Sequence, residues 1–160
     1  MYMVHPLETH HKPETPCVGI CSTIYGDVIC RGCFRHFQDV IDWNTYSPTH
    51  KNKILTSLEA LTVQVLEDAL EIFDLTLLTF QCEKHRIKIR PEWSPYTWVH
   101  ALLREGIHCI KSPEKYGFTV KPPLQHLSIS ALTQHIDDEL YDASQETTFL
   151  IFDEPLTASV

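Results

Sequence analysis

The sequence has few glycines and no long apolar run. Its 160 residues include 5 Gly and 2 Met, and 13 basic residues stand against 21 acidic ones, which gives a net charge of −8. No stretch approaches the 18 or more apolar residues that a membrane-spanning helix needs. The first 15 residues lack the apolar core and the cleavage site of a secretory signal. We therefore expect a cytoplasmic protein without membrane contact.

Catalytic signatures are also missing. The chain contains no Gly-rich phosphate loop, no G-x-S-x-G elbow and no H-E-x-x-H motif. The acids Asp137, Asp138, Glu139 and Asp142 could hold a hard cation, but their spacing is more typical of the solvated face of a helix. We therefore expect a protein that is not an enzyme.

The negative charge is concentrated at one end of the chain. No Lys or Arg follows Lys121, whereas residues 122–160 contain seven acids. The preceding part is nearly neutral, so the net charge does not exclude a polyanionic partner. The acidic C-terminal third is expected either to face solvent or to shield a basic segment.

The length suits one compact domain or a small module attached to one. Breakers and periodicity predict an α+β protein with four parts. These are a flexible tail over 1–15, a four-cysteine module over 16–46, a linking helix over 47–73 and a small mixed α+β domain over 74–160. A His10 and His11 pair lies in the tail and is expected to be solvated rather than to bind metal.

The pattern also predicts individual elements. Apolar spacing indicates a short helix ending near Trp43, and Ser-Pro pairs at 47–48 and 94–95 are good start signals for two further helices. Residues 75–80 fit either a strand or the end of the preceding helix. Strands are expected at 86–90, 107–111, 116–121 and 147–152, and a helix near 129–142.

Four cysteines form the most specific pattern. They are spaced C-x3-C-x8-C-x2-C, at Cys17, Cys21, Cys30 and Cys33, among three of the five glycines. Two close pairs joined by a short turn can bring four thiolates to one centre, as tetrahedral zinc or an iron–sulfur cluster requires. The three-residue gap in the first pair is less usual for zinc, so the spacing leaves the metal open. Arg31 and Arg35 are near enough in sequence to offset its negative charge.

Two readings of the cysteines need no metal. Buried structural thiols usually occupy apolar periodic segments, whereas these four stand beside Gly, Ser, Asp and Pro. A redox pair at Cys30 and Cys33 would normally follow a strand and open a helix in a βαβ unit, and no such unit precedes it. A metal centre is therefore the better interpretation.

Residues 16–58 resemble a small bacterial family of unknown function, whose members are described as predicted iron–sulfur proteins. The resemblance is carried by Pro16, the four cysteines at their spacing, Gly32, Arg35, an acid at Asp39, Val40, Trp43 and Ser47. Two positions depart from it: the residue after the last cysteine is Phe34 rather than Gly, and the acid is Asp rather than Glu. The resemblance implies a metal or cluster on the four cysteines and implies no catalytic residue.

A second group of cysteines and histidines is a weaker candidate for a metal site. Cys82, His85, His108 and Cys109 would supply four ligands if their segments paired. However, neighbours on a strand point to opposite faces, which makes joint ligation by His108 and Cys109 awkward. We expect ordinary core and surface residues here.

Residues 84–90 form a basic row. On a strand, Lys84, Arg86, Lys88 and Arg90 would line one face with a spacing able to follow nucleic-acid phosphates. Trp93, Tyr96 and Trp98 follow as possible stacking platforms. The alternatives are a solvated sheet face, an edge protected by Lys, or packing against the acidic C-terminal third.

Three functional hypotheses follow. The first is a non-enzymatic accessory protein whose four cysteines hold zinc or an iron–sulfur cluster and whose α+β domain binds a protein partner. The second is an iron–sulfur electron-transfer or redox-sensing protein. The third is a nucleic-acid-binding protein that uses the basic row.

Overall fold

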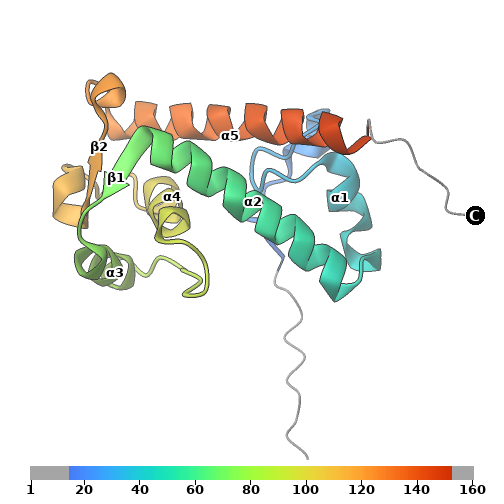
Figure 1. Ribbon diagram of the computed structural model, residues 1–160, viewed down its shortest axis with the longest axis horizontal. Helices are drawn as coiled ribbons and strands as arrows, with labels where there is room; N and C mark the ends of the chain where they lie inside the picture. Colours follow the sequence, from blue (N-terminus) through green and yellow to red (C-terminus); the bar gives the residue numbers. More distant parts are fainter. Residues whose placement is uncertain (1–14, 153–160) are drawn as a thin grey trace, which may run out of the picture.

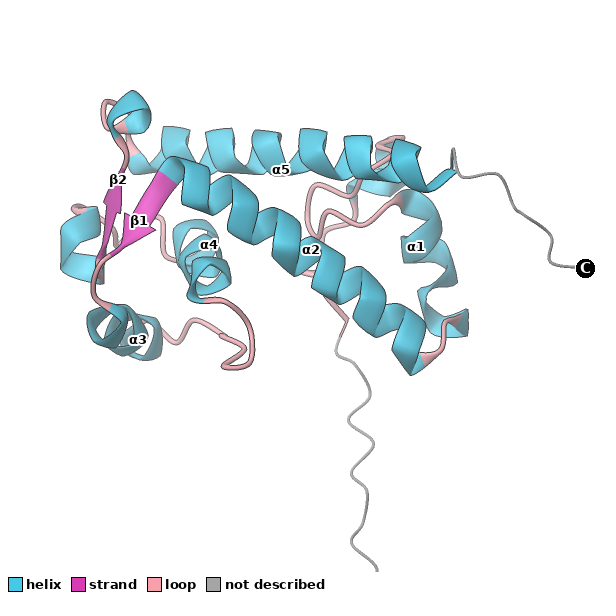
Figure 2. Ribbon diagram, in the orientation of Figure 1, coloured by secondary structure: helices cyan, strands magenta, loops and turns pink. Residues whose placement is uncertain are grey.

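The computed structural model describes residues 15–152 and has the expected α+β class (Figures 1 and 2). Five helices and two short strands follow one another as α1 (Phe37–Asp42), α2 (Pro48–Ala69), β1 (Leu70–Ile72), α3 (Leu75–Lys84), α4 (Pro95–Glu105), β2 (Phe118–Val120) and α5 (Ile129–Phe152). Short 3-10 turns lie at Ser22–Tyr25, Trp43–Thr45, Pro113–Tyr116 and Pro122–Leu124. In this part of the chain no helix is both long and apolar enough to cross a membrane.

Both Ser-Pro start signals are confirmed. The Ser47 hydroxyl accepts a hydrogen bond from the His50 backbone N–H at 3.2 Å, and the Ser94 hydroxyl accepts one from Tyr96. Each satisfies an amide that has no partner inside its helix, and each following Pro occupies a position where no amide is needed. These caps begin α2 and α4, and both helices supply side chains to the hydrophobic core.

The two strands form a small antiparallel sheet at one end of the molecule (Figure 2). Leu70 pairs with Val120 and Ile72 with Phe118, so the sheet joins the end of α2 to the segment before α5. The strand expected at 116–121 is therefore confirmed in its central part. Residues 75–80 belong to a separate helix, α3.

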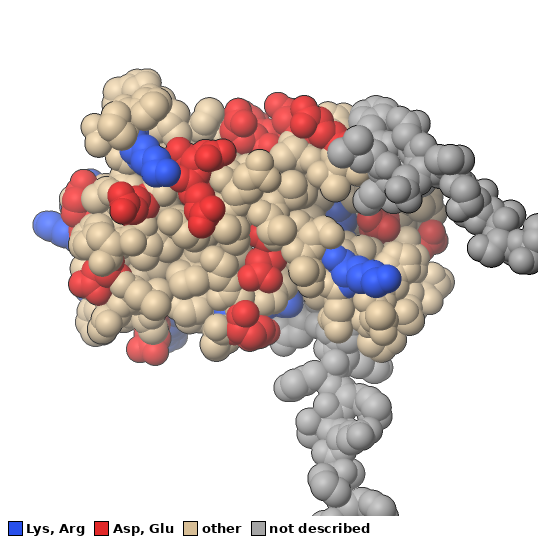
Figure 3. All heavy atoms as spheres, in the orientation of Figure 1, with Lys and Arg blue, Asp and Glu red and all other residues tan. Residues whose placement is uncertain are grey.

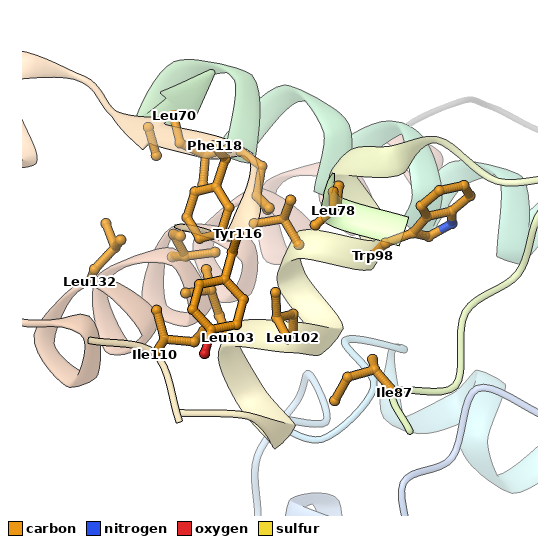
Figure 4. Close-up of a cluster of buried hydrophobic side chains, with 14 of the residues drawn as sticks. Leu70, Leu78, Ile87, Trp98, Leu102, Leu103, Ile110, Tyr116, Phe118 and Leu132 are labelled. Carbon is orange, nitrogen blue, oxygen red and sulfur yellow. The ribbon is translucent and has the colours of Figure 1, made fainter. Parts of the chain in front are cut away.

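One hydrophobic core fills the space between α2, α4, α5 and the sheet. Figure 4 shows a large part of it, including Trp98, Leu102 and Leu103 of α4 and Phe118 of β2. Burying a side chain of this size stabilises a fold by about 1.5–3 kcal/mol. Ile29 and Phe34 of the cysteine module belong to the same core. The module and the helices therefore share one hydrophobic interior.

The strand expected at 86–90 is wrong. Residues 82–87 instead end α3 with a left-handed turn, in which the Arg86 N–H bonds the Glu83 carbonyl and the Ile87 N–H bonds the Cys82 carbonyl. This is the hydrogen-bond pattern of a Schellman cap, with Arg86 at a φ of 56° where glycine is usual. Ile87 is buried beside the helix end, and residues 87–90 continue as a loop.

Two further strand predictions are also wrong. Residues 107–109 form a turn in which the Cys109 N–H bonds the Gly106 carbonyl at 2.8 Å. Residues 147–152 continue α5, which is longer than the helix expected at 129–142. The β-branched residues there favour a strand only weakly, and continuing the helix satisfies their backbone amides without a partner strand.

Charge is distributed unevenly over the surface. On the face shown in Figure 3, acidic side chains are spread over α2 and α5 and outnumber the basic ones. Two acids of α5 are nevertheless engaged: Asp137 lies 3.6 Å from Arg104, and Asp138 lies 3.5 Å from Arg31. Acids of α5 therefore form ion pairs with Arg31 of the cysteine module and with Arg104 of α4.

A glycine comparison tests the packing of the sheet end. Gly117 has a φ of 85°, and a Cβ there would collide with the Asp74 carbonyl, whereas Gly26 has a φ of 98° and open space around it. Gly26→Ala should cost about 1–2 kcal/mol of unfolding free energy through backbone strain alone. Gly117→Ala should cost about 3 kcal/mol, because the collision adds to the same strain. Urea unfolding of both variants measures the difference, and equal losses would contradict this packing.

Candidate metal centre

The four cysteines lie in two loops that precede α1. Cys17 and Cys21 bound the first loop, and Cys30 and Cys33 bound the second. All six cysteines of the chain are free thiols. The second loop is closed by backbone hydrogen bonds from Cys30 N–H to the Arg35 carbonyl and from Phe34 N–H to the Cys30 carbonyl, at 2.8 and 2.6 Å. This tight turn contains Cys30 and Cys33, and we call it the knuckle.

The two loops pack directly against each other. A Cβ at Gly32 would lie 2.5 Å from the Ile20 carbonyl oxygen and 2.9 Å from a methyl carbon of Val18, so only glycine allows this approach. The Cys30 thiol donates to the same Ile20 carbonyl at 3.7 Å. The Arg31 N–H donates to the Ser22 hydroxyl at 2.8 Å. The loop between Cys17 and Cys21 is thereby held beside the Cys30 and Cys33 knuckle.

Backbone amides near the sulfurs favour their ionised form. The Gly19 N–H donates to Cys17 Sγ at 3.4 Å. The backbone of Gly32 acts to lower the pKa of Cys30, and that of Arg35 acts to lower the pKa of Cys33. Such hydrogen bonds stabilise negative charge on sulfur and recur around metal-bound thiolates.

The environment shifts the pKa of the two knuckle thiols in opposite directions. Burial opposes ionisation of Cys30, but backbone donors from Cys33, Ser22 and Gly32 together lower its pKa below the ordinary value. Burial raises the pKa of Cys33, and the hydrogen bond from Arg35 offsets only part of this rise. Cys30 is therefore the knuckle thiol whose ionised form this environment favours.

Arg35 is a buried cation at the centre of this region. Its residue is 4% exposed, its Nε donates to Cys33 Sγ at 3.2 Å, and its guanidinium lies 4.6 Å from the centre of the Trp43 ring. Within residues 15–152 its Nη1 has no hydrogen-bond partner, and no carboxylate pairs with it. A buried charge of this kind is costly unless an opposite charge is close.

The conformation of Phe34 explains how this residue can stand where the family pattern has glycine. Its φ of 60° lies in the left-handed region that glycine adopts readily, so the knuckle keeps the backbone turn that a glycine would make. The phenyl ring is buried, 6.0 Å from the His100 ring, and the Arg104 guanidinium lies 5.5 Å from it. Burial of the ring offsets the backbone strain and anchors the knuckle to α4.

Polar contacts from the helices hold the same knuckle. Arg104 of α4 donates to the carbonyls of Gly32 and Arg31 at 2.8 and 3.2 Å. Its guanidinium is in turn held by Asp137 of α5, which also lies 2.9 Å from His100 Nε2. Arg104 is 72 residues from Gly32 in sequence, and no local pattern could have identified it as part of this site.

The structure brings only part of the predicted ligand set together. Cys30 and Cys33 are close enough for Cys33 to affect the pKa of Cys30, whereas Cys21 is bonded locally to the Thr23 hydroxyl at 2.9 Å and Cys17 is exposed. Across residues 15–152, no three or more His, Cys, Asp or Glu side chains are already grouped as a metal site would require. The donor chemistry suits a thiolate-bound metal, since the sulfurs carry amide donors and a buried guanidinium. Joint ligation requires the thiols of Cys17 and Cys21 to turn toward the knuckle.

The weaker candidates are not assembled. Cys82 is buried in the core, where burial raises its pKa to about 11, while His108 and Cys109 are exposed on a turn. The His85 ring packs 5.8 Å from that of Tyr116. The His10 and His11 pair lies outside the described residues. Of the acids on α5, Glu139 and Asp142 are exposed, as a solvated helix face predicts.

The basic row does not lie along a strand. Lys84 ends α3, Arg86 occupies the left-handed cap, and Lys88 and Arg90 lie in the loop that follows. Its expected regular spacing is therefore absent.

Comparison with known proteins bears on the cysteine region alone. No curated protein and no solved structure shows significant similarity to the chain. The expected resemblance of the cysteine segment to a small family of unknown function is confirmed. Residues 15–62, which span the two cysteine loops, α1 and the first part of α2, match the family described as "Protein of unknown function (DUF1289)".

Proposed function

We propose that this chain is a cytoplasmic, non-enzymatic accessory protein whose N-terminal module binds a metal through four thiolates. Cys17, Cys21, Cys30 and Cys33 would hold either zinc or an iron–sulfur cluster. The metal organises the two loops, and the α+β part of the chain binds a protein partner. Zinc would supply a structural link without redox chemistry, whereas a cluster would also carry an electron.

The observation that carries the proposal is the buried Arg35. Its guanidinium contacts Cys33 Sγ and retains an unbonded Nη1, with no carboxylate partner in the described part of the chain. With neutral thiols, no negative group among residues 15–152 would balance this cation, and the Trp43 ring would be its main electrostatic partner there. Zinc with four thiolates, or an oxidised cluster with four thiolates, carries a charge of about −2 and would balance the charge of Arg35. Arg31 and Arg104 add positive charge around the knuckle.

Metal binding is coupled to the order of the first loop. Residues 18–28 place several large apolar side chains on the surface, with Ile20, Ile24 and Tyr25 73%, 74% and 86% exposed. The loop therefore gains little stability from burial. Ligation by Cys17 and Cys21 would provide the missing stabilisation, as in other small domains whose folding depends on a metal.

A redox role is the second candidate. Cys17 is exposed, and the apolar side chains of Val18 and Ile20 beside it are 57% and 73% exposed. A cluster bound there would lie near the surface, beside an apolar patch of the kind that partner proteins cover. Binding of nucleic acid by the basic row is not proposed, because its regular spacing depended on the missing strand.

Replacing one knuckle cysteine tests the ligand set. Cys30→Ser should remove the metal and make residues 16–43 sensitive to protease, because serine is a poor ligand for a soft thiolate site. Cys109→Ser is the matched control, since Cys109 is exposed on a turn outside the cysteine loops and this variant should retain full metal. Metal content is measured on anaerobically purified full-length protein. An unchanged metal content in Cys30→Ser would refute the assignment.

Replacing Arg35 tests the charge argument. Arg35→Gln should release metal to a chelator about tenfold faster, because groups around a metal site typically contribute that much to its retention. Arg35→Lys keeps the charge and should recover part of the loss. Lys53→Gln on the exposed side of α2 should behave as wild type. Equal release rates in all three variants would remove Arg35 from the site.

The identity of the metal separates the two candidates. Iron with visible absorption that bleaches on addition of dithionite is expected for a cluster, and colourless protein with one zinc per chain for a structural site. Elemental analysis and spectra of the same anaerobic sample give the answer. The zinc result would end the redox candidate while leaving the structural one intact.

A further inference from the structure

An exposed apolar surface lies on α3, away from the cysteine loops. Phe73, Leu75 and Phe80 are 56%, 48% and 56% exposed there. Together with Thr76 and Thr79 they form a surface that we call the α3 face. Figure 1 shows α3 at the end of the molecule opposite α1. Contiguous exposed apolar side chains of this kind usually mark a surface that another molecule covers.

The α3 face points outward because the other side of the helix belongs to the core. Leu78 and Cys82 are fully buried, and the helical repeat of 3.6 residues places Thr76 and Phe80 on the opposite side. A shallow hollow of about 440 Å³ is lined by side chains of this face from Leu75 to Phe80 and by Glu83. The face can therefore receive an apolar side chain of a partner.

The α3 face is held rigidly by the fold. The backbone amides of Phe73 and Asp74 both donate to the Gly117 carbonyl, at 3.0 and 3.1 Å. The Asp74 carboxylate caps the first turn of the helix. The Thr79 hydroxyl donates to the Leu75 carbonyl at 2.8 Å, so it does not require a hydrogen bond from a partner. Little conformational freedom would be lost when this face is covered.

The two ends of the α3 face carry opposite charge. Glu71 of β1 and Asp74 lie at its N-terminal end, which carries −2. Glu83, Lys84 and Arg86 lie at its C-terminal end, which carries a net +1. In the described part of the chain, no ion pair engages Lys84 or Arg86. A helix of ten residues is about 15 Å long, so the two ends are well separated.

This charge pattern is complementary to a second copy of itself. When two α3 helices pack antiparallel around a two-fold axis, the acidic end of each lies over the basic end of the other. A parallel arrangement would instead place like charges together. Thr79 lies midway between Asp74 and Lys84, and its small side chain allows two helices to approach closely at the axis.

We propose that the α3 face is the contact surface of a homodimer in which two α3 helices pack antiparallel. Phe80 of each copy lies in the hollow of the other, and Lys84 of each lies near the acidic end of the other. Five side chains cover less than the roughly 800 Å² per partner of a stable interface, so we expect a dissociation constant of about 10–100 µM. The dimer does not depend on the metal, because the α3 face shares no residue with the cysteine loops.

Sedimentation velocity of the full-length chain between about 1 and 500 µM covers the range expected for such a small interface. Phe80→Asp should raise the dissociation constant at least about tenfold, because it puts a carboxylate into an apolar contact. Ile41→Asp is the matched control, since it adds the same charge at an exposed apolar position of α1 and should leave the constant unchanged. Thermal unfolding checks that both variants remain folded.

A charge exchange tests the antiparallel orientation. Glu71→Lys should weaken self-association about threefold and Lys84→Glu about tenfold, because the first removes the charge difference between the ends and the second makes both ends acidic. When one variant carries a fluorescent label, the mixed dimer should be tighter than the dimer of either variant alone. Stronger self-association of Glu71→Lys would indicate parallel helices and would contradict the proposal.

The same measurements can exclude the homodimer. A wild-type chain that stays monomeric over the whole concentration range would overturn the proposal and leave the α3 face to a partner of different sequence. A dimer that persists unchanged in Phe80→Asp would overturn it as well, because the contact would then lie elsewhere. Metal content of the same samples tests the metal proposal separately.

Discussion

Burial of Phe34 and Ile29 in the core of the helices is the constraint on which the cysteine region depends. The module has few apolar side chains that are buried, and its largest ones between residues 18 and 28 face solvent. Phe34 keeps a left-handed backbone at a cost of about 1–2 kcal/mol, which burial of its ring offsets. The position of Cys30 and Cys33 therefore follows from packing of the knuckle against α4 rather than from the loops alone.

Electrostatics reinforces this attachment. Arg104 links the carbonyls of the knuckle to Asp137, and Asp137 in turn meets His100 on the same helix as Arg104. Arg31 reaches Asp138 and stacks 4.2 Å from the ring centre of Tyr141. The acids of α5 thus hold the basic residues that flank the cysteines. This arrangement positions positive charge around sulfur while the surface of the protein stays acidic.

The sequence was informative where short-range chemistry decides the structure. Ser47 and Ser94 with their prolines marked two helix starts, and the cysteine spacing identified the segment that matches a known family. The class of the fold followed from the same local signals. These features depend on residues within a few positions of one another, so one sequence is enough to find them.

Prediction failed where long-range contacts or unusual backbone conformations determine the local structure. Residues 84–90 alternate as a strand does, but Arg86 takes the left-handed cap that glycine usually occupies, and the buried Ile87 fixes that cap. The contact of Arg104 with the knuckle spans 72 residues and leaves no trace in local spacing. The joint ligation of one metal by Cys17, Cys21, Cys30 and Cys33 also depends on more than their spacing, and it stays a prediction.

The shared core has a thermodynamic consequence for the whole chain. Because Ile29 and Phe34 belong to the same hydrophobic cluster as Leu102 and Phe118, the module and the helices should unfold in one cooperative transition. Any ligand that binds only the folded module then stabilises the entire chain by RT ln(1 + [L]/Kd). Loss of that ligand would lower the stability of α4 and α5 as well, although neither helix carries a ligand cysteine, so the lifetime of the protein would depend on the supply of its ligand.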